Sequence, residues 1–285
     1  DLSGPGGGGY GLAVDIGTTK IVVHLVDLES GDTVAEAKAE NPQVIYGEDI
    51  ISRLAYAMQN PGGLAELRSL VINAINNLAS AMLAESGVPG EEVLGSVLVG
   101  NTAMHHIALG IDVRGIASSP YVPAVRGSVE APSRRLGLLR GRYALFPPVI
   151  AGYVGSDAVA DVVATGLHLE DEPALLVDLG TNTEVVLSTG EQLLACSAPS
   201  GPAFEGAHMG HGMKAAVGAI ERVWLEGGEF RYSVIGDVKP IGLCGSAYID
   251  FAAEALRSGL LDERGFFRRD GDPRLRRGPR GYEYV

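Results

Sequence analysis

The stretch "AVDIGTTKIVVHLVD", residues 13–27, places the turn sequence "DIGTTK" between two runs rich in β-branched residues. A second stretch, "LVDLGTNTEVVLSTG", residues 176–190, repeats the arrangement, with Asp178 in the place of Asp15. β-Branched runs on both sides of a glycine turn are typical of a β-hairpin. The sequence therefore predicts two strands joined by a short turn, and it predicts this hairpin twice.

The residues of the turn suit a phosphate group and its metal ion. Asp15 ends a buried strand, so its carboxylate is expected to point beyond the sheet edge, where it can hold Mg²⁺ through water. Asp178 heads the second turn in the same way. Glycine lacks a Cβ atom, so backbone N–H groups beside it can approach a phosphate closely. The candidate nucleotide-binding residues are Gly17, Thr18 and Thr19 in the first turn and Gly180, Thr181, Asn182 and Thr183 in the second.

Two other phosphate-binding motifs do not explain these turns. A P-loop needs a lysine after a glycine and runs from a strand into a helix, but no lysine here follows a glycine. The G-x-G-x-x-G matches within residues 4–11 precede the first strand, whereas a dinucleotide fingerprint follows one. A single such turn could be a plain hairpin. Two copies at corresponding points of two similar halves indicate hairpins that clamp a triphosphate and its metal from both sides.

Composition limits the classes of partner. The chain has 285 residues, 46% of them hydrophobic, and a net charge of −13, which argues against binding a nucleic-acid backbone. There is no secretory signal pattern and no apolar run of about 18 residues that could span a membrane. We therefore expect a cytoplasmic protein with neither a nucleic-acid nor a membrane partner. Cys196 and Cys244 cannot complete a four-cysteine iron–sulfur site within one chain, although a cluster shared in a homodimer stays open.

The order of predicted elements indicates an α/β protein with a duplicated lobe. Strand, turn, strand, strand and helix begin at Leu12, and the same order begins again at Ala174. Apolar residues at helical spacing predict a helix over 65–87, and a second helix over 157–165 stops at Gly166. The second half is expected to contain a glycine-rich loop over 201–220 that leads into a helix. We expect a flexible linker at 1–9, a first lobe at 10–168 and a second lobe at 174–285, each a mixed sheet with flanking helices.

At this point a family resemblance becomes specific. Paired D-x-G-T hairpins resemble the phosphate-1 and phosphate-2 motifs of the actin, sugar-kinase and heat-shock-chaperone ATPase superfamily. The segment "GSDAVADVVATG", residues 155–166, is similar to its connect-1 helix, and Ser156 and Asp157 suit N-capping. The resemblance implies duplicated ribonuclease-H-like lobes with a nucleotide cleft between them, and ATP with Mg²⁺ as ligand. It also implies catalytic roles for Asp15, Asp157 and Asp178, with Asp157 near the attacking water.

One branch of the superfamily fits best. Six ordered segments together resemble the ATPase-like domain of the reductive activators of corrinoid proteins: "YGEDIISRL", "GNTAMHHIALG", "IAGYVGSDAVAD", "VDLGTNTE", "GPAFEGA" and "GLCGSAYID". The resemblance implies ATP turnover coupled to low-potential reduction of a corrinoid protein partner. An iron–sulfur cluster is expected only in an N-terminal ferredoxin-type domain, and the adenosine pocket is expected to be completed after Val285. Further nucleotide contacts are expected from Gly201, Glu205, Gly245 and Ser246.

Three alternatives stay open. A small-molecule kinase of the same superfamily could use Asp49 as its catalytic carboxylate. An activator like those of the hydroxyacyl-CoA dehydratases could hold a cluster between two chains through Cys196 or Cys244, although Cys244 reads better as a packed residue. A zinc site is a further possibility, with ligands from the histidines at 105–106 or from His208 and His211. No cysteine or carboxylate has a matching spacing, so we do not expect a zinc site.

Overall fold

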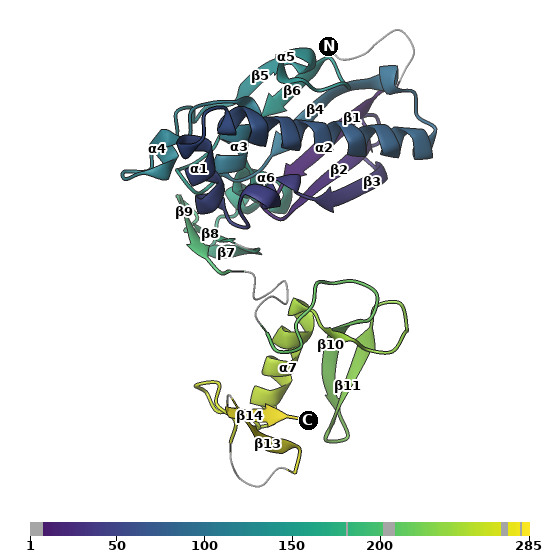
Figure 1. The fold of residues 1–285 in the computed structure, drawn as a ribbon, viewed down its shortest axis with the longest axis vertical. Coiled ribbons are helices and arrows are strands. Elements are labelled where there is room, and N and C mark those ends of the chain that lie inside the picture. Colours follow the sequence, from purple (N-terminus) through teal and green to yellow (C-terminus); the bar gives the residue numbers. More distant parts are fainter. Residues whose placement is uncertain (1–7, 181, 202–208, 269–272, 280) are drawn as a thin grey trace. The chain divides into compact units, whose positions relative to one another are not determined.

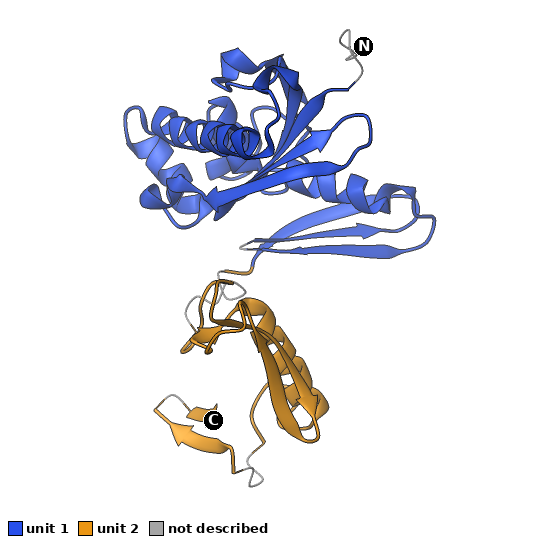
Figure 2. Cartoon of the chain, turned by 90° about the vertical axis from the view of Figure 1, so that its right-hand side faces the viewer, with its two compact units in different colours: residues 1–199 blue, residues 200–285 orange. Residues whose placement is uncertain are grey.

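The structure is a computed structural model that describes residues 8–180, 182–201, 209–268, 273–279 and 281–285. It divides into two compact units, residues 1–199 and residues 200–285 (Figure 2). The predicted start of a second lobe at 174 falls within the first unit, so the predicted lobe boundaries stay a prediction. Each unit is described by itself.

The first unit is built on a mixed six-stranded sheet (Figure 1). Its strand order is β3-β2-β1-β4-β6-β5, and β4 and β6 run parallel to β1 while β2 and β3 are antiparallel neighbours. The hairpin β1–β2 thus leads a mixed sheet, as predicted. The strands are β1 (Tyr10–Ile16), β2 (Lys20–Asp27), β3 (Thr33–Glu40), β4 (Val93–Val99), β5 (Val129–Pro132) and β6 (Tyr143–Phe146).

Alternation along β1 gives the sheet two distinct faces. Leu12, Val14 and Ile16 are buried, whereas Ala13 and Asp15 between them are exposed. Val14 pairs with Val23 and Ile16 with Ile21 across the hairpin, so β-branched side chains share the buried face. Asp15 therefore lies on the face of β1 opposite to this core.

The long helix α2 (Gly63–Ser86) covers the buried face, as Figure 1 shows. Its apolar face, with Leu67, Val71 and Ile75, packs into the main hydrophobic core. The predicted helix over 65–87 is confirmed, and Gly87 ends it in the left-handed conformation. The other helical segments of this unit are η1 (Pro42–Tyr46), α1 (Ile50–Gln59), η2 (Gly90–Glu92), α3 (Thr102–Leu109), α4 (Arg114–Ala117), α5 (Ser133–Leu136), α6 (Ser156–Thr165) and η3 (Leu167–Leu169).

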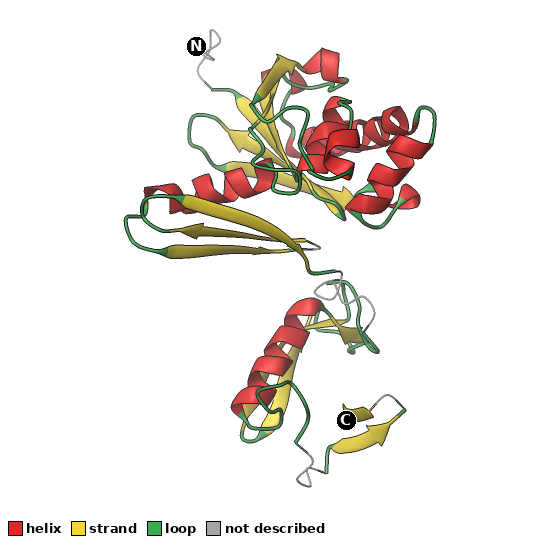
Figure 3. Cartoon of the chain, turned by 90° about the vertical axis from the view of Figure 1, so that its left-hand side faces the viewer, coloured by secondary structure: helices red, strands yellow, loops and turns green. Residues whose placement is uncertain are grey.

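The second predicted hairpin forms a three-stranded meander in the same unit (Figure 3). Its order β7-β8-β9 repeats the pairing of β1, β2 and β3, with β7 (Ala174–Leu179), β8 (Asn182–Ser188) and β9 (Leu193–Pro199). Val162 of α6 and Leu167 pack with Val186 of β8. The meander is thereby attached to α6, which brings the second hairpin next to the helix predicted to be connect-1.

The described residues of the second unit form two small sheets and one long helix. Its elements are β10 (Ala219–Glu226), β11 (Glu229–Val234), β12 (Gly242–Leu243), α7 (Gly245–Arg257), β13 (Leu275–Gly278) and β14 (Gly281–Tyr284). The predicted helix after the glycine-rich loop is wrong, because residues 219–226 form a strand. In "AIERVWLE" the side chains of Ala219 and Val223 are buried and Trp224 pairs with Arg231 of β11. A short run of β-branched and aromatic residues fits a strand as well as a helix, and here the hairpin with β11 decides.

Within the described residues, no helix is both long and apolar enough to cross a membrane.

Candidate nucleotide site

Carboxylates from both hairpins and from α6 meet in the first unit. The charge of Asp178, near the end of β7, acts on Asp15 at the end of β1. Asp161 and Asp157 of α6 belong to the same group. So does Glu184 of β8, whose charge acts on Asp157. We call these five residues the acidic cluster.

The surroundings of Asp15 favour its protonated form. The residue keeps solvent-accessible surface, yet the protein around it displaces much of the water that would hydrate the charge. This desolvation, followed by the charges of Asp178 and Asp161, raises the pKa of Asp15 to about 6, and only the nearby His24 works in the opposite direction. A cationic ligand would relieve this repulsion, so the cluster is suited to a metal–phosphate complex.

Asp157 carries the larger shift. Burial raises its pKa to about 7, although the hydrogen bond from the backbone N–H of Ala158, at 2.8 Å, works against the rise. The charges of Glu184 and Asp15 add to it. A carboxylate with a pKa near neutrality can take a proton from water at physiological pH, as a general base must.

Sequence reasoning missed two members of the cluster. Asp161 lies four residues after Asp157, so both side chains are on one face of α6, and its Oδ2 atom is buried without a hydrogen-bond partner among the described residues. Burial and Asp178 raise its pKa. Glu184 is only 5% exposed and accepts a hydrogen bond from Ser197 Oγ at 2.9 Å. The helical spacing in "DAVAD" was the signal for Asp161, and the register of the second hairpin, which places Glu184 opposite Asp178, was the signal for Glu184.

The first turn needs glycine for steric reasons, and the second leaves little room for a larger residue. A Cβ atom at Gly17 would lie 2.6 Å from the carbonyl oxygen of Lys20, and one at Gly180 would lie 3.1 Å from that of Asn182. Beside Gly17, Thr18 is buried and its Oγ1 accepts a hydrogen bond from Asn101 Nδ2 at 3.1 Å. The turn, at the end of the hairpin, is therefore held from inside the lobe.

The N-terminus of α6 is fastened to the end of β4. The carbonyl oxygen of Gly100 accepts hydrogen bonds from the backbone N–H groups of Ser156, at 3.0 Å, and Asp157, at 3.4 Å. Ser156 is fully buried and its hydroxyl bonds the backbone of Gly100. The expected N-capping by Ser156 or Asp157 is wrong, because the cap residue is Gly155 and it makes no side-chain bond. The carbonyl oxygen of Gly100, in place of a capping side chain, bonds the first N–H groups of the helix.

Gly155→Ala should loosen this attachment. A Cβ atom at residue 155 would lie 2.3 Å from the carbonyl oxygen of Gly100 and 2.4 Å from Cα of Asn101, and both are backbone atoms that cannot rotate away. We expect a loss of about 1–3 kcal/mol in the free energy of unfolding, measured by urea denaturation. Gly127→Ala is the control, because nothing lies within 4 Å of a Cβ atom there. Equal stability of the two variants would contradict the tight contact.

Other predicted contact residues lie outside the cluster. Thr181 and Glu205 are outside the described residues. Gly201, Gly245 and Ser246 belong to the second unit, where Gly245 and Ser246 begin α7 and Ser246 Oγ donates to the carbonyl oxygen of Glu221 at 2.6 Å. Thr19 lies in the first turn, and Asn182 and Thr183 begin β8 after the second. The nucleotide-binding roles of all these residues stay predictions.

His105, His106 and Cys244 are buried and have packing or hydrogen-bond partners within the fold. His106 Nδ1 lies 2.9 Å from the carbonyl oxygen of Thr102, and its Nε2 accepts from the N–H of Ala124 at 3.1 Å, which fixes the proton on Nδ1. His105 is buried and packs edge-on against Phe146. Cys244 is buried and bonds the carbonyl oxygen of Ile220, whereas Cys196 is exposed. His208, of the other predicted pair, is outside the described residues.

His105 should make the protein sensitive to acid. Burial, and then the neighbouring His106, lower the pKa of His105 from 6.5 to about 4, so the folded protein holds it neutral while the unfolded chain takes up a proton. Its contribution to stability is complete above pH 6.5 and is lost as the pH falls from 6.5 to about 4. The raised carboxyl pKa values act with the opposite sign, so the free energy of unfolding of His105→Leu is compared with that of the parent at each pH. The expected difference is a flatter fall in the variant, and parallel curves would contradict it.

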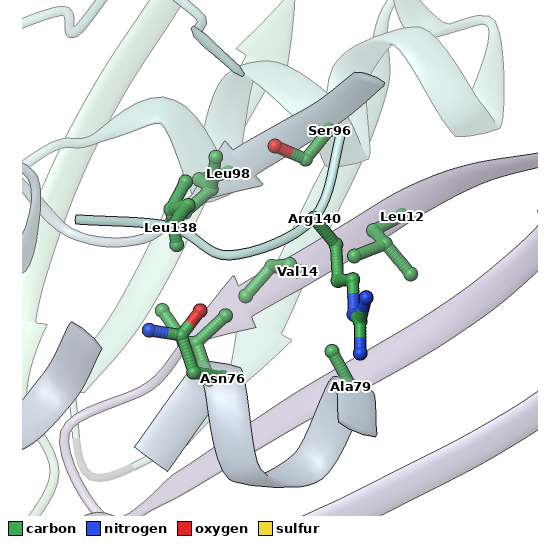
Figure 4. A pocket seen from close by; sticks show the side chains of 9 residues that line it. Leu12, Val14, Asn76, Ala79, Ser96, Leu98, Leu138 and Arg140 are labelled. Atoms are coloured by element: carbon green, nitrogen blue, oxygen red, sulfur yellow. The ribbon is translucent and has the colours of Figure 1, made fainter. Parts of the chain in front are cut away.

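A pocket beneath α2 is separate from the acidic cluster. It is lined by residues of β1, β4 and α2 and by the 138–140 segment: Leu12, Val14, Ile75, Asn76, Ala79, Ser96, Leu98, Leu138 and Arg140 (Figure 4). Leu12 and Val14 lie on the buried face of β1, and Asp15 lies on the other face. The pocket therefore belongs to the packing of the core.

Comparison with known proteins fits this geometry. A family model described as the RACo middle region matches residues 10–170, and another, described as the C-terminal domain of RACo, the ASKHA domain, matches residues 172–285. The chain belongs to the RACo family. The ASKHA domain is the actin, sugar-kinase and chaperone fold to which the paired hairpins pointed, so the predicted fold class and family are confirmed. A RACo-type ASKHA domain implies nucleotide binding.

The similar proteins are named as activators or reductases that act on corrinoid proteins. The chain is 32% identical over 260 residues to the corrinoid activation enzyme RamQ of Eubacterium limosum, covering 90% of this chain and 44% of that protein. It is 26% identical to the methylated-amine-specific corrinoid protein Co(II) reductase of Methanosarcina barkeri, covering 89% of this chain and 52% of that protein. A solved reductive activator for a corrinoid iron–sulfur protein is 40% identical, with a TM-score of 0.83, over 97% of this chain and 45% of that one. The chain spans about half the length of these relatives.

Proposed function

We propose that this chain is the ATP-hydrolysing part of a reductive activator, a protein that couples ATP turnover to low-potential reduction of a corrinoid protein. The observation that carries the proposal is the meeting of Asp15, Asp178 and Asp157 in one acidic cluster, from both hairpins and the helix between them. Membership of the RACo family and the names of its relatives supply the corrinoid partner. Electrons would come from an iron–sulfur cluster in another part of the protein.

The cluster supports a hydrolytic reaction. The backbone N–H groups and hydroxyls of the two turns bind the β- and γ-phosphates. The oxygen of a water molecule attacks the γ-phosphorus, the bond to the β–γ bridging oxygen breaks and ADP leaves. Asp157 accepts the proton of the water, which suits the pKa of about 7 that its surroundings give it.

The donor set fits a hydrated Mg²⁺. Mg²⁺ usually keeps several waters and binds one or two carboxylates together with substrate phosphates. Asp15 and Asp178 would hold it, through water, and it would neutralise phosphate charge. Among the described residues no three His, Cys, Asp or Glu side chains are grouped so that they could hold a metal ion. After desolvation, the charges of Asp178 and Asp161 contribute to the raised pKa of Asp15, and a cation bound there would offset them.

The structure weakens the kinase alternative. Asp49, its candidate catalytic carboxylate, is the N-cap of α1 and accepts a hydrogen bond from the N–H of Ser52 at 2.7 Å. A residue in this role is explained by helix stability alone. Buried Cys244 likewise has packing and hydrogen-bond partners that account for it without a cluster.

A reduction assay with the full-length protein tests the proposal. A purified corrinoid protein in the Co(II) state is mixed with the activator and a low-potential donor such as Ti(III) citrate, and the absorbance change to Co(I) is recorded. We expect reduction with MgATP, and little with ADP or with a non-hydrolysable ATP analogue. Equal reduction with and without ATP would contradict the coupling, and phosphorylation of an added sugar without reduction would favour the kinase.

A further inference from the structure

Two buried asparagines hold the first phosphate turn from behind. Asn41 is fully buried and donates from Nδ2 to the carbonyl oxygen of Gly17 at 2.8 Å. Asn101 is 5% exposed and donates from Nδ2 to Thr18 Oγ1 at 3.1 Å. They come from the segment after β3 and the segment after β4, so two distant parts of the chain converge on adjacent residues of the turn.

Each asparagine has its amide orientation fixed by a second bond. Asn41 Oδ1 accepts from the N–H of Gln43 at 3.0 Å and caps η1, while Asn101 Oδ1 accepts from the N–H of Met104 at 3.0 Å and caps α3. An oxygen that accepts a backbone N–H cannot exchange places with the NH₂ group. Both NH₂ groups therefore donate to the turn, and that of Asn41 also donates to Met104 Sδ at 3.8 Å.

These bonds determine what the turn offers to a ligand. The peptide unit is planar, so holding the carbonyl of Gly17 toward Asn41 turns the N–H of Thr18 the opposite way, away from the interior. Because Thr18 Oγ1 accepts from Asn101, the single hydroxyl proton of Thr18 is left to donate elsewhere. The turn thus presents an N–H group and an O–H group in fixed directions before any phosphate binds.

Asn101 also connects the turn to α6. Its neighbour Gly100 accepts the N–H groups of Ser156 and Asp157, and Gly155 packs against Asn101 with no room for a Cβ atom. A continuous set of contacts therefore runs from Thr18 through Asn101 and Gly100 to Asp157, the residue predicted to orient the attacking water.

We propose that Asn101 is a positioning residue that keeps the phosphate-binding Thr18 hydroxyl in register with Asp157, so that nucleotide bound at the turn meets the water held by α6. The inference rests on the proposed function, because it assigns Asn101 a part in ATP hydrolysis. When a bound nucleotide is misplaced by about 1 Å, its hydrolysis can slow greatly even though it still binds. Loss of the Asn101 bond should therefore affect turnover more than affinity.

Asn101→Ser in the full-length protein tests this inference. Serine still caps α3 but has no NH₂ group to reach Thr18. The matched control is Asn76→Ser. Asn76 is a buried asparagine of α2 that hydrogen-bonds the backbone of Gly137 and Leu139, and among the described residues it makes no hydrogen bond to the turn. We expect kcat for ATP hydrolysis to fall about tenfold in Asn101→Ser, the effect of one hydrogen bond, with the Kd of ATP little changed. Asn76→Ser should lose about as much thermal stability as Asn101→Ser and should keep the parent kcat for ATP hydrolysis.

Thr18 supplies the second variant. Thr18→Val removes the hydroxyl and keeps the shape, so it should slow hydrolysis at least as much as Asn101→Ser, and the double variant should be no slower than Thr18→Val. Thr18→Ser restores the hydroxyl and should keep most of the rate. Multiplying losses in the double variant, or a normal kcat in Asn101→Ser, would overturn the inference while leaving the proposed function intact. A parent protein that does not hydrolyse ATP would contradict the proposed function itself.

Discussion

Asp178→Asn in the full-length protein is expected to abolish most ATP hydrolysis while leaving the protein folded. Asn keeps the size of the side chain but removes the charge that would hold a hydrated Mg²⁺ on the phosphates. Removing a group that stabilises charge in the transition state typically costs about 10²–10³ in kcat. Hydrolysis is measured by phosphate release under MgATP saturation, so that a loss of turnover is separated from a loss of affinity.

The control for this prediction removes the same charge from outside the cluster. Asp171→Asn changes an exposed residue of the loop before β7. It should hydrolyse ATP at the parent rate and show the same circular dichroism. If Asp178→Asn also kept the parent rate, the second hairpin would be a plain structural turn, and the interpretation of the duplicated motif would be wrong.

Asp157→Asn should slow hydrolysis while ATP still binds. A water-positioning or general-base carboxylate typically contributes about 10²–10⁴ in rate. The pKa of about 7 adds a signature in pH, because kcat/KM reports the free protein. In the parent, kcat/KM should rise with pH through about 7 as Asp157 loses its proton, with a further contribution near the pKa of about 6 of Asp15. In Asp157→Asn the component near 7 should be absent.

The contradicting result for Asp157 is equally specific. Loss of ATP binding in Asp157→Asn, with no separate effect on turnover, would make the residue part of the fold of α6. An unchanged pH profile would show that another group takes the proton. Isothermal titration with ATP at the pH of the assay separates these outcomes.

Local patterns accounted for the elements that carry the cluster. The hairpins at Asp15 and Asp178 were predictable because β-branched strands flank a short polar turn. Helix α6 was predictable from its apolar spacing and the terminal Gly166. In each case the information lies within about a dozen neighbouring residues, and tertiary packing did not override it.

The parts that could not be predicted depend on contacts between distant segments. Asn41 and Asn101 reach the first turn from two other segments of the chain. The hydrogen bond from Asn101 to Thr18 spans 83 positions, so no local pattern could reveal it. The strand at 219–226 is a different case, because its partner β11 follows after only the turn Gly227-Gly228, a local hairpin signal that the prediction of a helix did not use.

A double-mutant cycle on ATP hydrolysis tests most directly whether the two hairpins serve one nucleotide. The rates of the parent, Asp15→Asn, Asp178→Asn and the double variant are compared in the full-length protein. If both aspartates hold the same Mg²⁺–phosphate complex, the double variant should be about as slow as the slower single variant, because one loss already removes the shared interaction. If the two losses multiply, each turn acts independently, and the account of a clamp formed by both hairpins is contradicted.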